Sequence, residues 1–202
     1  MAYSDFTLKD IKDKFGISNK VESLFEDISS VPISENLEED LALARVLPVR
    51  SEKAKSELII MPILIELMKR NKRFFTIYSG DTLNADKEKG LSGECDFILA
   101  KNVGTFDINT PIFTMVEAKK SDVQIGIPQC AAQMIGAKYY NKAANQEVEK
   151  IYGCVTTADD WIFLKLEGEQ LTIDNKKYYL GNVGEVLGIF QFIIDYYKKV
   201  LT

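Results

Sequence analysis

The stretch PIFTMVEAKK, residues 111–120, decides the fold because it begins as a buried strand and ends in charged side chains. The proline suits a strand start, and the apolar residues after it are typical of the core of a sheet. Side chains alternate along a strand, so one face is predicted to carry Phe113, Met115, Glu117 and Lys119. We therefore expect a carboxylate and an amine to lie side by side where a buried strand ends.

The preceding stretch LSGECDFILAK, residues 91–101, predicts a second strand that is also interrupted by a carboxylate, Asp96. The segment between the two strands is short enough for antiparallel neighbours, which would bring Asp96 beside Glu117. Two carboxylates so close repel, and each raises the pKa of the other unless they share a cation. Aspartate, glutamate, backbone carbonyls and water are the ligands that Mg²⁺ prefers. With Lys119 to orient a water or stabilise charge on a phosphate, the pattern indicates a metal-assisted phosphodiester hydrolase.

Hydrophobic periodicity and turn residues place further elements on both sides of these two strands. The predicted helices are 51–70, 127–143 and 183–201, and the predicted strands are 71–80, 91–101, 111–120, 150–157, 160–168 and 176–180. Ser51 is the expected N-cap of the first of these helices, and Pro62 is expected to bend it. The order of these elements indicates an α/β fold with a mixed sheet and helices on both faces.

The first 48 residues differ from the rest because they mix short amphipathic stretches with acidic residues. Periodicity predicts a helix within residues 5–17 and another within residues 35–47, with Ser34 as the N-cap of the second. A proline then breaks the chain. We therefore divide the protein into an N-terminal helical extension, residues 1–48, and a larger domain, residues 49–202.

The composition limits the chemistry that the chain can perform. It contains no histidine, which excludes a Ser-His-Asp triad and an H-E-x-x-H zinc site. Its three cysteines are widely spaced and form no C-x-x-C pair, which argues against a disulfide framework and a structural zinc site. No apolar run approaches the roughly 20 residues of a membrane span, and no signal-peptide pattern is present. These features predict a cytoplasmic protein without a membrane partner.

The motif and the element order together resemble a known family. ECDFILA (residues 94–100) and FTMVEAKK (residues 113–120) look like the D…(E)xK signature of the PD-(D/E)XK nuclease superfamily, including small bacterial members. The αβββαβ order over roughly residues 48–166 is similar to the core of that family. The resemblance implies a restriction-endonuclease-like core, preceded by the helical extension. Cys95 stands where the name-giving proline would be, which is a departure at a loosely kept position.

The resemblance also implies roles for individual residues. Asp96 and Glu117 would bind Mg²⁺ or Mn²⁺, with the backbone carbonyl of Ala118 as a third ligand. Lys119 would be the catalytic lysine of a Mg²⁺-dependent deoxyribonuclease, cutting DNA as an endonuclease.

Two helices are expected to add one side chain each to this site. In the helix before the motif, Glu52 would support the metal or its waters, and Glu57, on nearly the opposite helix face, is the alternative. The helix after the motif resembles one in which such nucleases often place a glutamine facing the site. Gln129 is the first choice there, and Gln133, one turn later, is the second.

Other interpretations of the same pattern remain open. Asp10 and Lys12 show the acid-x-Lys spacing on a predicted helix surface, so Glu117 and Lys119 alone would also fit a solvated ion pair at a frayed strand end. Asp96 and the element order favour the site. The net charge of −5 does not suggest indiscriminate nucleic-acid binding, so a non-cleaving binding or regulatory module is the alternative function. DNA is the expected partner, RNA stays possible, and a homodimer would supply two active sites for two strands.

Overall fold

The chain folds around one β-sheet, and the computed structural model describes residues 2–201 of it. The strands are β1 (Ser18–Glu22), β2 (Phe75–Asp86), β3 (Leu91–Lys101), β4 (Ile112–Ala118), β5 (Lys150–Thr156), β6 (Asp160–Glu167), β7 (Gln170–Asp174) and β8 (Tyr178–Tyr179). The α-helices are α1 (Leu8–Phe15), α2 (Glu35–Val46), α3 (Glu52–Lys55), α4 (Met61–Arg70), α5 (Val123–Ala143) and α6 (Val183–Val200). Short 3-10 turns span Tyr3–Asp5 and Leu180–Asn182.

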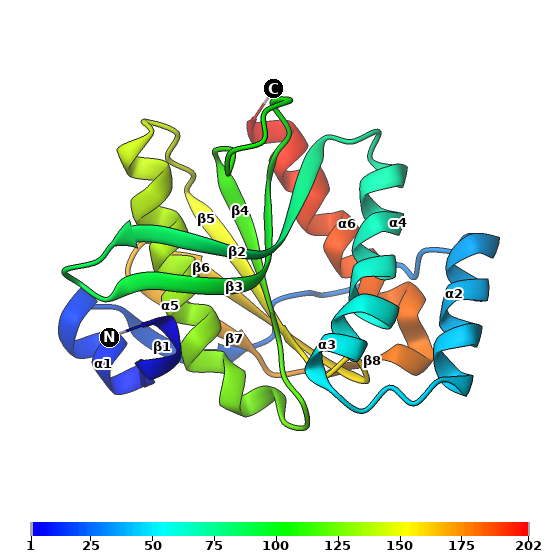
Figure 1. Ribbon diagram of the computed structural model, residues 1–202. Coiled ribbons are helices and arrows are strands. Elements are labelled where there is room, and N and C mark those ends of the chain that lie inside the picture. Colours follow the sequence, from blue (N-terminus) through cyan, green and yellow to red (C-terminus); the bar gives the residue numbers. More distant parts are fainter. Residues whose placement is uncertain (1, 202) are drawn as a thin grey trace.

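The sheet is mixed and is covered by helices on both faces (Figure 1). Its strands follow the order β1-β7-β6-β5-β4-β3-β2, and β8 pairs with β6 off this path. The β1–β7 and β4–β5 pairs are parallel, and the other pairs are antiparallel. One hydrophobic core lies between the sheet and α5, and another between the sheet and helices α4 and α6. The predicted α/β class is confirmed; within residues 2–201, no helix could span a bilayer.

Strand β4 contains an irregularity that decides which way its side chains point. The pairing of β3 with β4 slips by one residue at Phe113, which makes a β-bulge. The ring of Phe113 therefore turns toward α6, where its centroid lies 4.5 Å from that of the Tyr197 ring. Met115, beyond the slip, packs into the core beneath α5. The prediction that Phe113 and Met115 share one face is wrong, because the bulge shifts the alternation by one residue.

The predicted helix 51–70 is present, with a π-helical turn in its middle. The hydroxyl of Ser51 accepts a backbone N–H of the first turn at 3.1 Å, so the predicted cap is confirmed. After the four residues of α3 the helix widens into a π-helical turn, Ser56–Ile60, and α4 follows. Pro62 has no N–H for the carbonyl four residues earlier, so a regular α-helical ladder cannot pass through it. The bend expected at Pro62 stays a prediction, and what the structure shows before this proline is the π-helical turn.

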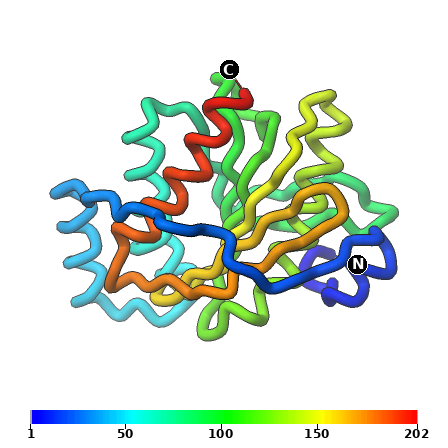
Figure 2. The backbone as a smooth tube through the Cα atoms, turned by 180° about the vertical axis from the view of Figure 1, so that it is seen from behind, coloured from blue at the N-terminus to red at the C-terminus, as the bar shows by residue number. Residues whose placement is uncertain are grey.

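The N-terminal segment contains both predicted helices, α1 and α2, and the Ser34 hydroxyl caps α2 by accepting a backbone N–H at 3.3 Å. It also contributes strand β1, which runs along β7 at the edge of the sheet (Figure 2). Neither β1 nor β7 is predicted from the sequence. Every side chain of β1 is exposed, Val21 at 62 %, so the strand lacks the alternation on which such predictions depend. The division at residue 48 stays a prediction, although this segment is part of the sheet.

The remaining boundaries agree with the sequence, except at β2. That strand was predicted over 71–80, but Lys72 and Arg73 form a turn with positive φ after α4, so it begins at Phe75. The other elements are confirmed with small shifts: the helices at 127–143 and 183–201, the hairpin at 150–168, and the edge strand at 176–180.

The 3-10 turn at the start of the chain is fixed against α5 by Tyr3. The hydroxyl of Tyr3 donates to the carbonyl of Leu83 at 3.1 Å, and the ring is buried. Gly136 of α5 leaves the space that this ring fills, because a Cβ at that position would lie 2.9 Å from Tyr3 Cζ and closer still to the hydroxyl. The N-terminal turn is therefore held by shape as well as by a hydrogen bond.

This close contact predicts that Gly136→Ala destabilises the fold by about 1–3 kcal/mol, the usual cost of overpacking a core. Urea unfolding measures the loss. Gly181→Ala is the matched control, since a Cβ there meets nothing within 4 Å, and it should cost no stability. In a Tyr3→Ala background, Gly136→Ala should be nearly neutral. If the losses of stability in the two single variants simply add in the double variant, the contact is contradicted.

Candidate active site

The two carboxylates predicted to meet do lie on adjacent strands. Phe97 of β3 pairs with Val116 of β4 at the end of the antiparallel ladder, and Asp96 and Glu117 are the residues directly beyond that pair. Asp96 also reaches across to the end of β4, where its Oδ2 accepts the N–H of Ala118 at 2.7 Å. This hydrogen bond fixes one oxygen of Asp96 against the strand that carries Glu117.

Lys119 follows the last residue of β4 and points back to Glu117. Its backbone N–H donates to the carbonyl of Thr156 at 2.8 Å, which continues the pairing with β5. Its Nζ lies 2.6 Å from Glu117 Oε1 and donates to Gln129 Oε1 at 3.0 Å. Glu117 is 1 % exposed and the side chain of Lys119 19 %, so this is a buried pair rather than a solvated pair at a frayed strand end.

Helix α5 passes close over this pair because it carries a glycine there. A Cβ at Gly126 would lie 2.5 Å from Val155 Cγ1 and 3.0 Å from Lys119 Cγ. Neither approach is compatible with normal packing, so the glycine allows the first turn of α5 to cover the stem of Lys119. The direction of the lysine is therefore fixed by packing and by its two hydrogen bonds.

The two candidate glutamines both contact the pair, in different ways. Gln129 accepts from Lys119. Gln133 is fully buried, and its Nε2 donates to Glu117 Oε2 at 2.6 Å. Its own Oε1 has no hydrogen-bond partner among the described residues. The sequence alternatives thus correspond to two distinct contacts, one on the lysine and one on the carboxylate.

These groups open onto a cavity of about 290 Å³. It is lined by Ala2, Tyr3, Ser4, Glu52, Gly93, Glu94, Asp96, Glu117, Lys119 and Gln129. An adjoining cavity of about 360 Å³ shares Glu52, Glu94 and Asp96 with it and includes Glu57. Glu57 lines only that second space, which favours Glu52 as the helix-borne acid beside the pair.

The sequence motif did not identify Glu94 and Tyr3 as parts of this cavity. Glu94 stands two residues before Asp96 on β3, so strand alternation could have suggested it. No comparable signal exists for Tyr3, because it reaches the cavity only through its tertiary contacts with α5 and the β2–β3 hairpin.

The surroundings raise the pKa of both carboxylates. Burial and then the charge of Asp96 raise the pKa of Glu117 to about 7, against the hydrogen bonds from Lys119 and Gln133. Burial also raises the pKa of Asp96, and the charge of Glu52 adds to the effect. Burial alone would lower the pKa of Lys119, but its contact with Glu117 raises it, so the lysine stays protonated.

Comparison with known proteins does not assign the chain to a family. No protein-family model matches the chain. No curated protein matches it either. The likeness to the PD-(D/E)XK superfamily therefore rests on the motif and the element order.

A divalent cation would find an oxygen donor set beside this pair. Each oxygen of Glu117 accepts one hydrogen bond and keeps a further lone pair, and Asp96 Oδ2 accepts the N–H of Ala118. Within residues 2–201, no group of three or more His, Cys, Asp and Glu side chains is arranged to hold a metal. Mg²⁺ commonly takes one or two carboxylates and keeps several waters. Asp96, Glu117 and the Ala118 carbonyl therefore fit such an ion chemically.

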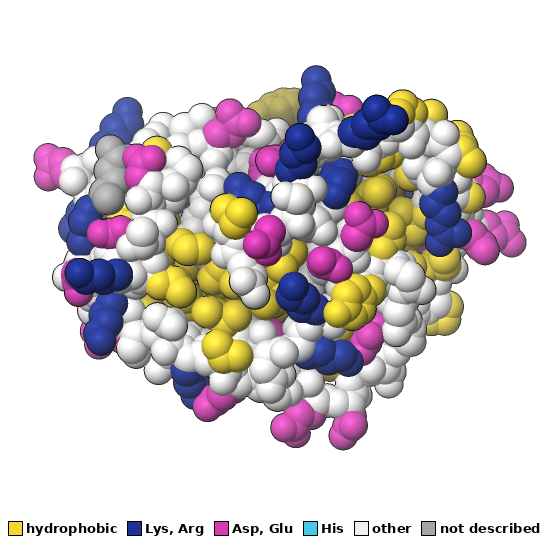
Figure 3. Space-filling model, turned by 90° about the horizontal axis from the view of Figure 1, so that it is seen from below, with side chains coloured by type: hydrophobic (Ala, Val, Ile, Leu, Met, Phe, Trp, Pro, Cys, Tyr) yellow, Lys and Arg dark blue, Asp and Glu magenta, His cyan; other side chains and the backbone are white. Residues whose placement is uncertain are grey.

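The charge around the cavity is mixed rather than basic. The loop joining β4 to α5 lies at the bottom of Figure 1, and the view from that side shows basic and acidic side chains interspersed (Figure 3). Four carboxylates but a single ammonium line the 290 Å³ cavity. A polyanion entering it would need added cations to offset this negative charge.

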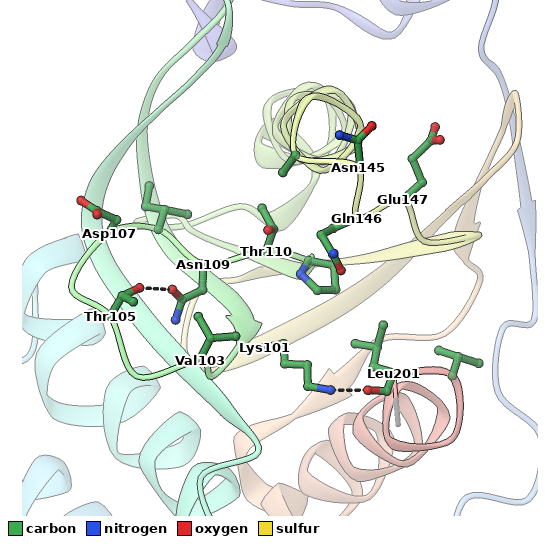
Figure 4. A pocket seen from close by; sticks show the side chains of 14 residues that line it. Lys101, Val103, Thr105, Asp107, Asn109, Thr110, Asn145, Gln146, Glu147 and Leu201 are labelled. Atoms are coloured by element: carbon green, nitrogen blue, oxygen red, sulfur yellow. Dashed lines mark hydrogen bonds between the residues drawn. The ribbon is translucent and has the colours of Figure 1, made fainter.

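A larger cavity, about 790 Å³, lies among the loops at residues 101–111 and 144–147 and the end of α6 (Figure 4). Lys101 Nζ donates to the Leu201 carbonyl at its edge. None of the predicted site residues is among those that line it. Size alone therefore does not mark the site, and the paired carboxylates favour the smaller cavity.

Proposed function

We propose that the chain is a metal-dependent phosphodiester hydrolase, and specifically a DNA endonuclease of the PD-(D/E)XK type with a restriction-endonuclease-like core. The observation that carries this proposal is the buried contact of Lys119 with Glu117, beside Asp96 on the adjoining strand. Carboxylates with raised pKa values, such as Asp96 and Glu117, together with a protonated lysine are typical of active sites that stabilise charge in the transition state.

The residues of the site have separate roles in this proposal. Asp96, Glu117 and the Ala118 carbonyl would hold Mg²⁺ or Mn²⁺, which would lower the pKa of a bound water and offset phosphate charge. Lys119 keeps its proton and places its ammonium at the cavity, where it orients the attacking water or stabilises the charge on the phosphate. Gln129 holds Lys119 in that direction, and Glu52 would support the waters of the cation.

Metal-dependent cleavage of plasmid DNA by the purified protein tests this proposal. We expect cleavage with Mg²⁺ or Mn²⁺, none with EDTA, and a rate at least about 100-fold lower in Lys119→Ala, comparable with loss of a charge-stabilising donor. Lys165→Ala is the control, since this lysine forms an ion pair with Glu167 on β6, outside the cavity. Equal background rates for wild type and Lys119→Ala would refute catalysis. A single-stranded RNA substrate belongs in the same assay, because the side chains do not distinguish the sugar.

The negative cavity supports a second candidate function, a non-cleaving binding or regulatory module. Both oxygens of Glu117 already have protein partners, and the carboxylates outnumber the ammonium. Such a module would bind nucleic acid or protein without cutting and would gain no stability from Mn²⁺. Binding without cleavage in a gel-shift assay, together with an unchanged melting temperature in Mn²⁺, would favour it.

A further inference from the structure

Lys55, the last residue of α3, makes contacts that the catalytic motif does not explain. Its side chain is 14 % exposed. Its Nζ donates to the carbonyl of Lys120 at 3.0 Å and to the carbonyl of Thr157 at 2.8 Å. Asp159 Oδ2 lies 3.6 Å away. An ammonium loses much hydration when buried, and here two accepting carbonyls and a neighbouring carboxylate offset that loss.

These contacts join three segments that meet at the candidate site. Lys120 directly follows Lys119, whose backbone is paired with Thr156. Thr157 is the first residue after β5, and Asp159 belongs to the same turn. Glu52 lies three residues before Lys55, on the neighbouring position of the same helical face. The side chain of Lys55 therefore links the helix that carries Glu52 to the strand end that carries Lys119.

Helix α3 is the partly exposed first turn of a longer helix. It is four residues long, and none of those residues is fully buried. Its ladder continues into the π-helical turn, since the N–H of Ser56 donates to the carbonyl of Glu52, and α4 follows that turn. Ser51 caps its start by accepting the N–H of Ala54, within the same turn. The hydrogen bonds of Lys55 join this first turn directly to the segments that follow β4 and β5.

We propose that Lys55 is a positioning residue that sets the separation of Glu52 from the Asp96, Glu117 and Lys119 cluster. Lys55 is absent from the lining of the 290 Å³ cavity, so it acts through the residues that it holds. Its catalytic consequence rests on the proposed nuclease function, whereas the connection between α3 and the end of β4 does not. Small displacements of a reacting group are costly, because a shift of about 1 Å can slow an enzyme about 100-fold.

Lys55→Met and Lys55→Arg test this role. Methionine keeps the length and apolar stem without donors, and arginine restores donors to both carbonyls. We expect Lys55→Met to lower kcat by roughly 10- to 100-fold with KM changed less than about threefold, and Lys55→Arg to recover most of the rate. Lys165→Met is the control, another half-buried lysine in an ion pair but outside the site, and its kcat should stay at the wild-type value.

Hydrogen exchange measures the connection without any activity. Amide exchange over residues 118–121 should become roughly tenfold faster in Lys55→Met, as the loss of a charged hydrogen bond predicts. It should return toward the wild-type rate in Lys55→Arg and be unchanged within α6. Unchanged exchange at 118–121 overturns the proposal, and so does a fall in melting temperature with kcat preserved. If the wild type does not cleave, the nuclease function fails, and the exchange rates alone decide whether Lys55 holds these segments.

Discussion

Asp96→Asn is expected to abolish stabilisation by Mn²⁺ and to lower the cleavage rate at least about 100-fold. Substitution of residues that only hydrogen-bond to metal ligands already lowers metal affinity or activity roughly 10- to 100-fold, and loss of a ligand should cost at least as much. A cation that binds only the folded wild type should add about 2.7 kcal/mol at a concentration 100 times its Kd. For a chain of this size that is a rise in Tm of roughly 5–10 °C. Thermal melts with and without millimolar Mn²⁺ measure the difference.

The asparagine variant should fold, because its side-chain oxygen can still accept the N–H of Ala118, as Asp96 Oδ2 does. Removal of one of two neighbouring negative charges should leave its Tm without metal unchanged or higher. Asp195→Asn on α6 is the control, since Asp195 pairs with Lys198 away from the cavity, and it should keep the full response to Mn²⁺. An equal Mn²⁺ shift in Asp96→Asn and wild type would exclude Asp96 as a ligand.

Glu117→Gln is expected to change how stability depends on pH. The pKa of Glu117 is raised to about 7 in the folded protein, so folding favours its protonated form. Its contribution to the free energy of unfolding is therefore complete below its ordinary pKa, near 4.5, and is lost as the pH rises through about 7. Asp96 has a raised pKa too and acts in the same direction. The wild type should lose stability relative to Glu117→Gln by up to about 3 kcal/mol between pH 5 and 8.

Urea unfolding of both proteins at pH 5, 6, 7 and 8 measures this difference. Glu167→Gln is the control, since the hydrogen bond from Lys165 lowers the pKa of Glu167 and its carboxyl stays ionised over that range. Its curve should run parallel to that of the wild type. If the curve of Glu117→Gln is parallel as well, Glu117 does not titrate in this range. Added Mn²⁺ should flatten the wild-type decline, because a bound cation favours the ionised carboxylate.

The adjacency of Asp96 and Glu117 could be predicted from sequence because it depends on short-range features. Two apolar strands joined by a short connection pair with each other, and alternation then places the interrupting carboxylates together. The same rule failed for Phe113, because a β-bulge leaves no mark in the pattern of apolar residues. Strand β1 was missed for a related reason, since its side chains are all exposed.

Other parts of the site depend on contacts between distant segments. Tyr3 reaches the cavity through a space at Gly136, and Lys55 reaches the carbonyls of Lys120 and Thr157. No local pattern encodes such pairs, because each half is unremarkable in its own segment. The sequence could not decide between Gln129 and Gln133 either. Both lie beside the Glu117–Lys119 pair, because α5 crosses that pair and the two glutamines are one turn apart.

The pairing of β1 with β7 also sets the order in which the protein can be completed during synthesis. Ser18 and Gln170 are 152 residues apart and pair in register. At about 5–20 residues per second, a ribosome needs roughly 10–30 s to add that length. Until then the first strand has no partner, whereas β2, β3 and β4 can already pair among themselves. The paired carboxylates can thus form on a nascent chain well before the edge of the sheet near the N-terminus is closed.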